Sequence, residues 1–97
     1  MFRKDQFEWD ENKRLINLEK HRIDFRGAIR IFEQPSVHVP SGYWGEERWI
    51  TIGELNGWMI MVVWTWRGSR KRIISARRLK EDEQRRYQDN DSGGSSP

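Results

Sequence analysis

The stretch EERWITIGELNGWMIMVVWTWRGSRKRIISAR, residues 46–77, decides the fold of this chain. It contains a short alternating segment, Trp49–Ile52, a Gly/Asn-rich break, and then a long apolar run from Trp58 to Trp66. A tight turn at Arg67-Gly68-Ser69 leads back through the basic segment Arg70–Arg77. Short β-prone runs separated by such turns are typical of an antiparallel meander. The stretch therefore predicts the centre of one antiparallel sheet.

The apolar run within this stretch is apolar on both faces of the predicted strand. One face carries Trp58, Ile60, Val62, Trp64 and Trp66, and the other carries Met59, Met61 and Val63. A strand of this kind lies in the centre of a sheet and is covered on both sides. We expect helices on one side, and a partner is a candidate for the other.

Two helices are predicted before this stretch. Asp10 is a suitable N-cap for a helix over Glu11–Lys20, after a short strand at Phe7–Trp9. The apolar stripe of this helix is expected to consist of Leu15, Ile16 and Leu18. A second helix begins after Asp24. Its apolar residues follow the i, i+3, i+4, i+7 spacing of a helix that lies on a sheet, and they are Phe25, Ala28, Ile29 and Phe32.

The remaining segments complete the order of elements. Val37–Val39 is a short strand candidate that ends at Pro40 and Ser41-Gly42, and a last helix is expected from about Leu79 to Gln88. Residues 89–97 are rich in Gly and Ser and predict a disordered tail after a single domain over residues 1–88. The order predicts an α+β fold, with two N-terminal helices packed on a four- to five-stranded antiparallel sheet, plus a C-terminal helix.

Length and composition narrow the class of protein. The 97 residues fit one domain, and the absence of cysteine excludes a disulfide scaffold and a thiolate zinc site. The N-terminal residues lack the apolar stretch of a signal peptide, and the longest apolar run, Trp58–Trp66, is too short to span a bilayer. We therefore expect a soluble, cytoplasmic protein that has no membrane partner.

Positive charge is concentrated near the end of the chain. Residues 67–87 carry nine Lys/Arg against three acidic residues, a net charge of +6, whereas residues 1–66 carry nine against ten, a net charge of −1. A near-neutral body with a basic segment indicates a polyanionic partner such as a nucleic acid. A solvated arginine surface without a partner is the alternative.

Several motifs, in order along residues 7–88, make the chain resemble the BrnT family. In the N-terminal half they are Phe7-Glu8-Trp9-Asp10, Asn17 with Lys20-His21, and Phe25 with Ala28. In the C-terminal half they are Glu46-Glu47-Arg48, Ile52-Gly53, Thr65 with Arg67-Gly68, Arg72–Arg77, and Glu83 with Tyr87. One departure is Trp64, at a position where relatives often have His, so no imidazole can be assigned to that strand.

The resemblance implies a fold, an activity and a partner. BrnT proteins are ribonuclease toxins of type II toxin–antitoxin systems, with a RelE-like fold, and they arrest translation. The resemblance implies a BrnA-like antitoxin with a ribbon-helix-helix domain, a heterotetramer of toxin and antitoxin, and contact with operator DNA only through the antitoxin.

Arginines are the candidates for metal-independent RNA cleavage. When the 2′-hydroxyl of RNA attacks the adjacent phosphate, a protein must accept a proton, stabilise charge on phosphorus and protonate the leaving oxygen. The guanidinium group suits the second task, because it grips two phosphate oxygens and keeps its charge. The candidate phosphate ligands are Arg48, Arg67, Arg72 and Arg77. The sequence shows no His pair, no carboxylate cluster at metal spacing and no Gly-rich phosphate loop, so neither a metal nor another cofactor is expected.

Other residues have both a functional and a structural interpretation. Glu47 is a candidate general base or an ion-pair partner of an arginine, and Tyr87 a proton donor, a stacking residue or an anchor for the last helix. The candidate RNA-binding residues are Lys20, His21, Trp66, Arg70 and Lys71. Trp44 and Trp66 are candidate stacking platforms or parts of the surface that the antitoxin covers.

Regular alternation along the last strand would divide its cations between two faces. It would place Arg70 and Arg72 with Ile74 on one face, and Lys71 and Arg77 with Ile73 on the other. Three functions remain open at this point: a ribonuclease toxin, a basic module that binds RNA or DNA within a repressor complex without cleaving it, and a scaffold that receives an acidic protein.

Overall fold

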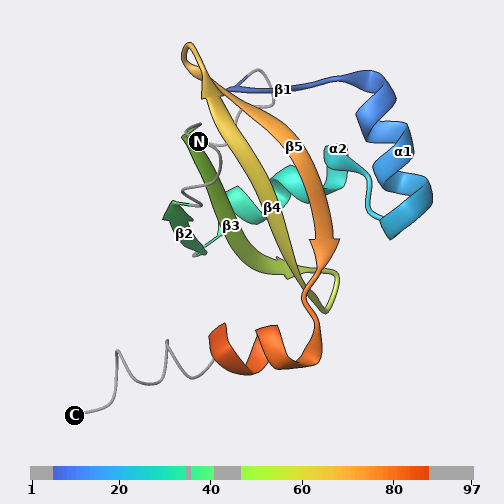
Figure 1. Ribbon diagram of the computed structural model, residues 1–97, viewed down its shortest axis with the longest axis vertical. Coiled ribbons are helices and arrows are strands. Elements are labelled where there is room, and N and C mark those ends of the chain that lie inside the picture. Colours follow the sequence, from blue (N-terminus) through green and yellow to red (C-terminus); the bar gives the residue numbers. More distant parts are fainter. Residues whose placement is uncertain (1–5, 35, 41–46, 88–97) are drawn as a thin grey trace.

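The computed structural model describes residues 6–34, 36–40 and 47–87 (Figure 1). Its strands and helices are β1 (Phe7–Trp9), α1 (Glu11–His21), α2 (Phe25–Ala28), the 3₁₀-helix η2 (Ile29–Glu33), β2 (Val37–Pro40), β3 (Arg48–Leu55), β4 (Trp58–Arg67) and β5 (Arg70–Arg78). A last helix occupies residues 81–87. The expected turn at Ser41-Gly42, the expected platform at Trp44 and the expected tail at 89–97 lie outside the described residues.

The five strands form one sheet in the order β1-β5-β4-β3-β2. The pairs β2–β3, β3–β4 and β4–β5 are antiparallel, as expected for a meander. The expectation of a wholly antiparallel sheet is wrong at one edge, because β1 pairs with β5 in parallel. A hairpin forces its two strands to be antiparallel, but β1 and β5 come from opposite ends of the domain and share no hairpin. The fold is therefore α+β with a mixed sheet.

One face of the sheet is covered by the N-terminal helices. In Figure 1, the helical segment formed by α2 and η2 passes behind the sheet, and α1 lies beside β5. The core between these layers includes Phe25, Ile29 and Ile31 from the helical segment, all at most 1% exposed, and Val62 and Ile73 from the sheet. No helix within residues 6–34, 36–40 and 47–87 is both long and apolar enough to cross a membrane.

Helix α1 packs through polar residues, so the expected apolar stripe is wrong. Leu15 and Ile16 are 49% and 62% exposed, whereas Arg14 and Asn17 are buried. The Asn17 amide donates to the carbonyl oxygens of Ile23 and Ala76 and accepts a bond from the Ala76 N–H. These bonds occupy the edge of β5 just beyond its pairing with β1, which decides the face of α1 that turns inward.

Local capping chemistry defines the starts of the helices as expected. Asp10 accepts from the Lys13 N–H and caps α1, and Asp24 accepts from the Arg26 N–H and caps α2. Helix α1 ends at Arg22, which takes the left-handed conformation with a φ of 60°. Gly53 does not break the strand. It lies inside β3, where an added Cβ would approach the Ile31 Cβ to 3.0 Å, and the hairpin turn follows at Asn56-Gly57.

A β-bulge in β5 changes which of its cations share a face. Trp64 pairs with Ile73 and Val63 pairs with Ser75, so Ile74 is an extra residue. The bulge reverses the alternation after it. Arg77 therefore lies on the face of Arg70 and Arg72, and the expected grouping of Arg77 with Lys71 is wrong.

Candidate functional site

The face of the sheet opposite the N-terminal helices, the open face, is ordered in rows of paired residues. The two middle rows are largely apolar. One contains Val37, Ile52, Met61 and Arg77, and the next contains Val39, Ile50, Val63 and Ser75.

The rows beyond these are polar and lead to the β4–β5 hairpin, at the top of Figure 1. Pairing across four strands aligns Arg48, Thr65, Arg72 and Glu8. One step further, Arg67 pairs with Arg70. Four of the predicted arginines therefore share one face and one end of the sheet. This arginine end consists of Arg48, Thr65, Arg67, Arg70 and Arg72.

Hydrogen bonds hold the middle of the arginine end in place. The Arg72 Nη1 donates to the Glu8 Oε2 over 2.6 Å, and both side chains are about one-quarter exposed. The Thr65 Oγ1 donates to the backbone oxygen of Glu47 over 2.6 Å, which fixes the start of β3 beside the row. The side chain of Glu47 is itself exposed. A guanidinium group oriented by a carboxylate still has N–H groups to offer to a phosphate.

Arg77 lies at the other end of the open face. It is five positions after Arg72 in the sequence, which corresponds to roughly 13 Å along a strand with one bulge. Its Nη1 and Nη2 each donate to an oxygen of Glu83, both over 2.8 Å. This ion pair and the Lys80 N–H lower the pKa of Glu83 to about 2. The main contact of Arg77 is thus with the last helix.

Lys20 and His21 lie with Arg77 and not with the arginine end. Both residues end α1, beside a shallow hollow that is also lined by Lys13 and Ser75. Partial burial lowers the pKa of His21, and the charges of Lys20 and Arg77 lower it further. His21 is therefore neutral at pH 7 and able to accept a proton.

Lys71 and Trp66 lie on the face covered by the helices. They pair with each other across β4 and β5, and the Lys71 Nζ is 4.7 Å from the centroid of the Trp66 ring. The same Nζ lies within 6 Å of the rings of Phe7, Phe32 and Trp64. This aromatic surrounding stabilises the cation in place. The structure thus separates Lys71 and Trp66 from the arginines with which they were predicted to bind RNA.

Tyr87 extends from the last helix over the apolar rows. That helix starts where the Glu83 carboxylate accepts the Lys80 N–H over 2.8 Å, and Leu79 instead continues the sheet by donating to the Met59 oxygen. The helix therefore begins two residues later than expected, and Lys80 stands at its cap position with Glu83 bonding back to it. Tyr87 thus lines the same hollow as the apolar rows and Glu83, and Arg72 does not line it.

Comparison with known protein families assigns the chain to a family. Residues 9–83 match the family of the ribonuclease toxin BrnT of type II toxin–antitoxin systems. This chain belongs to the BrnT family. A search of curated proteins gave no matching relative. The match covers the arginine end completely, whereas Glu8 and Tyr87 lie just outside it.

Membership of the BrnT family gives the class of protein and the class of its partner. The chain is a ribonuclease toxin, and a type II toxin has a protein antitoxin as its partner. Among the described residues, no group of three or more His, Asp or Glu side chains is placed to hold a metal ion. The polar groups gathered on the open face of this BrnT chain are chiefly guanidinium groups.

Sequence reasoning missed two structural roles near the site. Glu8 orients Arg72, and its only signal was its place in the Phe7–Asp10 motif. Trp64 lies on the helix-covered face, where its Nε1 donates to the buried Thr51 Oγ1 over 2.7 Å. The residue at position 64 of this BrnT chain therefore faces away from the arginine end, and the replacement of the frequent His concerns the core.

Proposed function

We propose that this BrnT toxin is a RelE-like, metal-independent endoribonuclease that cleaves RNA at the arginine end of its open face and thereby inhibits translation in the cytoplasm. The observation that carries the proposal is the row Arg48–Thr65–Arg72, in which two arginines flank Thr65 on neighbouring strands. Two arginines on either side of one residue can bind a single phosphate group from both sides.

The four arginines of the arginine end and two neighbouring glutamates have proposed roles. Arg48 and Arg72 stabilise the charge that develops on phosphorus when the 2′-hydroxyl attacks. Arg67 and Arg70, at the exposed hairpin, bind the flanking phosphates of the strand. Glu47 accepts the proton of the 2′-hydroxyl as its oxygen bonds to phosphorus; the bond from phosphorus to the 5′-oxygen breaks, and that oxygen takes a proton from water. Glu8 positions the Arg72 guanidinium and does not itself touch the substrate.

The residues at the other end of the open face have a different proposed role. Arg77 is held by Glu83 and lies beside the neutral His21, so this group supports an RNA strand that extends along the sheet. Lys20 adds a further phosphate contact, and Tyr87 offers a ring for base stacking. The group lies too far from Arg72 to act on the same phosphate.

The partners of the toxin follow from the family. We propose a BrnA-like ribbon-helix-helix antitoxin, a heterotetramer built on the antitoxin dimer, and contact with operator DNA only through the antitoxin. A scaffold or a non-catalytic binding module would need no aligned pair of arginines.

The test uses short single-stranded RNA and the same sequence with 2′-deoxy sugars throughout, both in EDTA. We expect the RNA alone to be cut and to leave 2′,3′-cyclic phosphate ends, because the attacking group is the 2′-hydroxyl. A translating extract serves as a second substrate, since the messenger RNA is then presented on ribosomes. If RNA and messages both stay intact while the protein binds RNA, the non-catalytic binding module is the correct function.

A further inference from the structure

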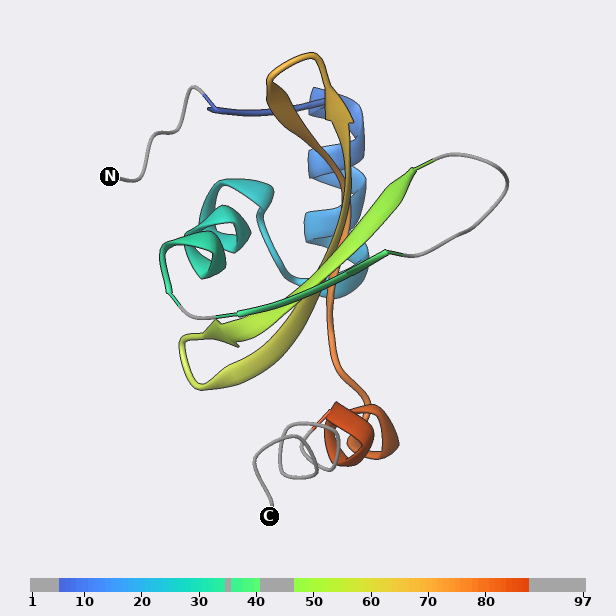
Figure 2. The same cartoon turned by 90° about the vertical axis from the view of Figure 1, so that its left-hand side faces the viewer.

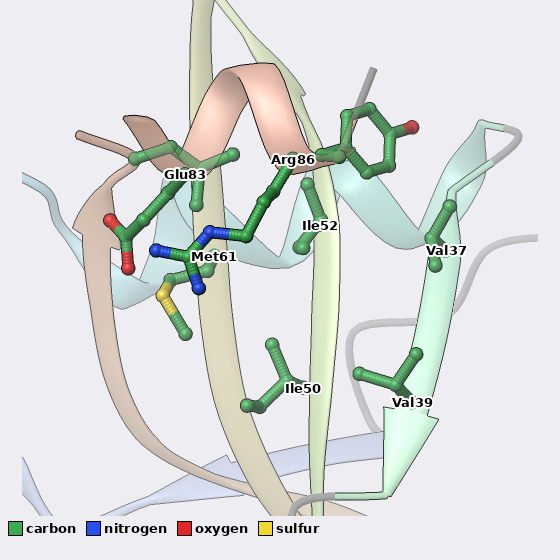
Figure 3. A pocket seen from close by; sticks show the side chains of 9 residues that line it. Val37, Val39, Ile50, Ile52, Met61, Glu83 and Arg86 are labelled. Carbon is green, nitrogen blue, oxygen red and sulfur yellow. The ribbon is translucent and has the colours of Figure 1, made fainter. Parts of the chain in front are cut away.

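The apolar rows of the open face form the floor of a groove. It has a volume of about 410 Å³ and lies between the sheet and the last helix (Figure 3). Its floor is aliphatic and consists of Val37, Val39, Ile50, Ile52 and Met61. Its rim is formed by the last helix, through Leu79, Glu83, Arg86 and Tyr87. Figure 3 shows the Arg86 side chain reaching from that helix toward the floor.

The floor of the groove is not fully covered within the described residues. Val39 is 38% exposed, and Ile50, Ile52 and Met61 are half-buried, whereas Thr51, Ile60 and Val62 on the opposite side of β3 and β4 are buried under the helices. A continuous aliphatic surface of this kind marks an interaction site. It also agrees with the sequence pattern of β4, which is apolar on both faces.

The chemistry of the floor favours a protein as its occupant. Single-stranded RNA is bound through aromatic stacking, phosphate contacts and hydrogen bonds to base edges, and five aliphatic side chains offer none of these. The C-terminal residues 88–97 cannot fill the groove, because they have no aliphatic or aromatic side chain other than Pro97. Side chains of another protein are therefore the matching partner.

The groove is continuous with the arginine end. Ile50 and Arg48 are successive residues on the same face of β3, about 7 Å apart along the strand. A bound segment that leaves the groove along β3 would next meet Arg48 and then Arg72. Acidic side chains complement that surface, and a segment that carries them would cover both guanidinium groups.

We propose that the groove is the docking site of the protein antitoxin, which places aliphatic side chains on the floor and acidic residues of the same segment on Arg48 and Arg72. The family supplies the class of partner, a type II antitoxin. Contacts with the aliphatic floor supply the affinity. The acidic residues placed over Arg48 and Arg72 explain how binding neutralises the toxin. Only this last point rests on the proposed ribonuclease site.

The test measures the affinity of toxin variants for the purified cognate antitoxin by titration calorimetry. The double variant Val39→Asp/Met61→Glu places two carboxylates on the floor, where they are desolvated on binding and repel the acidic segment. We expect its dissociation constant to rise at least about 100-fold. The matched control is Ile16→Asp, which changes an exposed aliphatic residue on α1, outside the groove. We expect it to change the dissociation constant less than about threefold.

Three further measurements keep docking separate from folding, self-association and catalysis. Thermal melts must show both variants folded, and the single-turnover rate of RNA cleavage by the free toxin, with the protein in excess over the RNA, is expected to be unchanged in the groove variant, since neither Val39 nor Met61 has a proposed role in cleavage. Unchanged antitoxin affinity in the folded groove variant, or an equal loss with Ile16→Asp, would overturn the proposal. So would a free toxin that is a dimer and becomes a monomer in the groove variant, because the groove would then bind a second copy. Failure of the ribonuclease assay alone would leave the affinity result intact and would overturn only the proposed cleavage.

Discussion

Asn17 is the residue on which the attachment of α1 to the sheet depends. It is 6% exposed, and its amide satisfies both the N–H and the C=O of Ala76 where the β5 edge has no neighbouring strand. A buried backbone group left without a partner costs about 1–3 kcal/mol. The side chain thus substitutes for a short piece of strand.

We predict that Asn17→Ala lowers the free energy of unfolding by about 2–4 kcal/mol, because two backbone groups and the Ile23 oxygen lose their partner. Urea denaturation checks this, with Asn12→Ala as the control, since Asn12 is exposed on the same helix. A loss of similar size in both variants would show that Asn17 has no special role.

Local residue chemistry was predictable, but the buried face of α1 was not. Asp10 and Asp24 cap helices as expected, because capping depends on neighbours one to three residues away. The burial of Arg14 and Asn17 depends on Asp24 and on the β5 backbone, which the periodicity of one helix cannot reveal. Leu15 and Ile16 were consequently placed on the wrong side.

At the scale of elements, the last helix is held chiefly by one ion pair. Glu83 bonds both to the Arg77 guanidinium and to the Lys80 N–H, so it anchors the helix and caps it at the same time. Its pKa falls from 4.5 to about 2 for these reasons. A depressed carboxyl pKa means that the charged form stabilises the fold. That stability is fully present above about pH 4.5 and is lost as the pH falls toward 2.

We predict that Glu83→Gln destabilises the protein above pH 4.5 and has almost no effect near pH 2, where the wild-type carboxyl is also becoming neutral. The measurement is the difference in unfolding free energy between wild type and variant across this range. Glu81→Gln is the control, because Glu81 is exposed and its ion pair with Arg85 is long, at 3.9 Å, and contributes little to stability. A wild-type–variant difference that does not change with pH would contradict the anchoring role of Glu83.

Element order was predictable, whereas two relations between elements were not. The hairpins follow from Asn56-Gly57 and from Gly68, which take positive φ angles. The parallel pairing of β1 was missed because no local signal joins it to β5. The bulge at Ile74 was missed because Ile73 and Ile74 are both apolar, so the sequence does not show which of them is the extra residue. That one residue decides the face on which Arg77 lies.

At the scale of the whole molecule, the open face of the sheet carries three regions one after another. The β4–β5 hairpin and the last helix lie at opposite ends of the molecule (Figures 1 and 2). The arginine end lies at that hairpin, and the aliphatic groove lies between it and the last helix. The basic segment near the end of the chain is thereby divided between the two faces of the sheet. Arg67, Arg70 and Arg72 face open surface, whereas Lys71 turns to the aromatic residues on the other side.

The composition of the chain indicated an arginine-based site, and strand pairing reduced the candidates. Arg48, already a candidate from the sequence, stays in the group because it lies opposite Thr65, a pairing across strands that follows from the hairpin register. Lys71 and Trp66 are excluded because strand alternation places them on the other face of the sheet. Arg77 is excluded by its distance from Arg72 along β5. The sequence alone indicates which residue types suit RNA cleavage. Which of these residues lie together follows from the register of the strands.

The central claim is that Arg72 belongs to the site of RNA cleavage. The most direct measurement is the single-turnover rate of RNA cleavage by Arg72→Ala, with the protein in excess over the RNA. Removal of one transition-state donor is expected to lower this rate about 10²–10³-fold, with RNA still bound. The control Arg30→Ala, which removes an exposed arginine from η2, is expected to stay within about twofold of wild type. A folded Arg72→Ala protein that cleaves at the wild-type rate would contradict the account and place the ribonuclease site elsewhere.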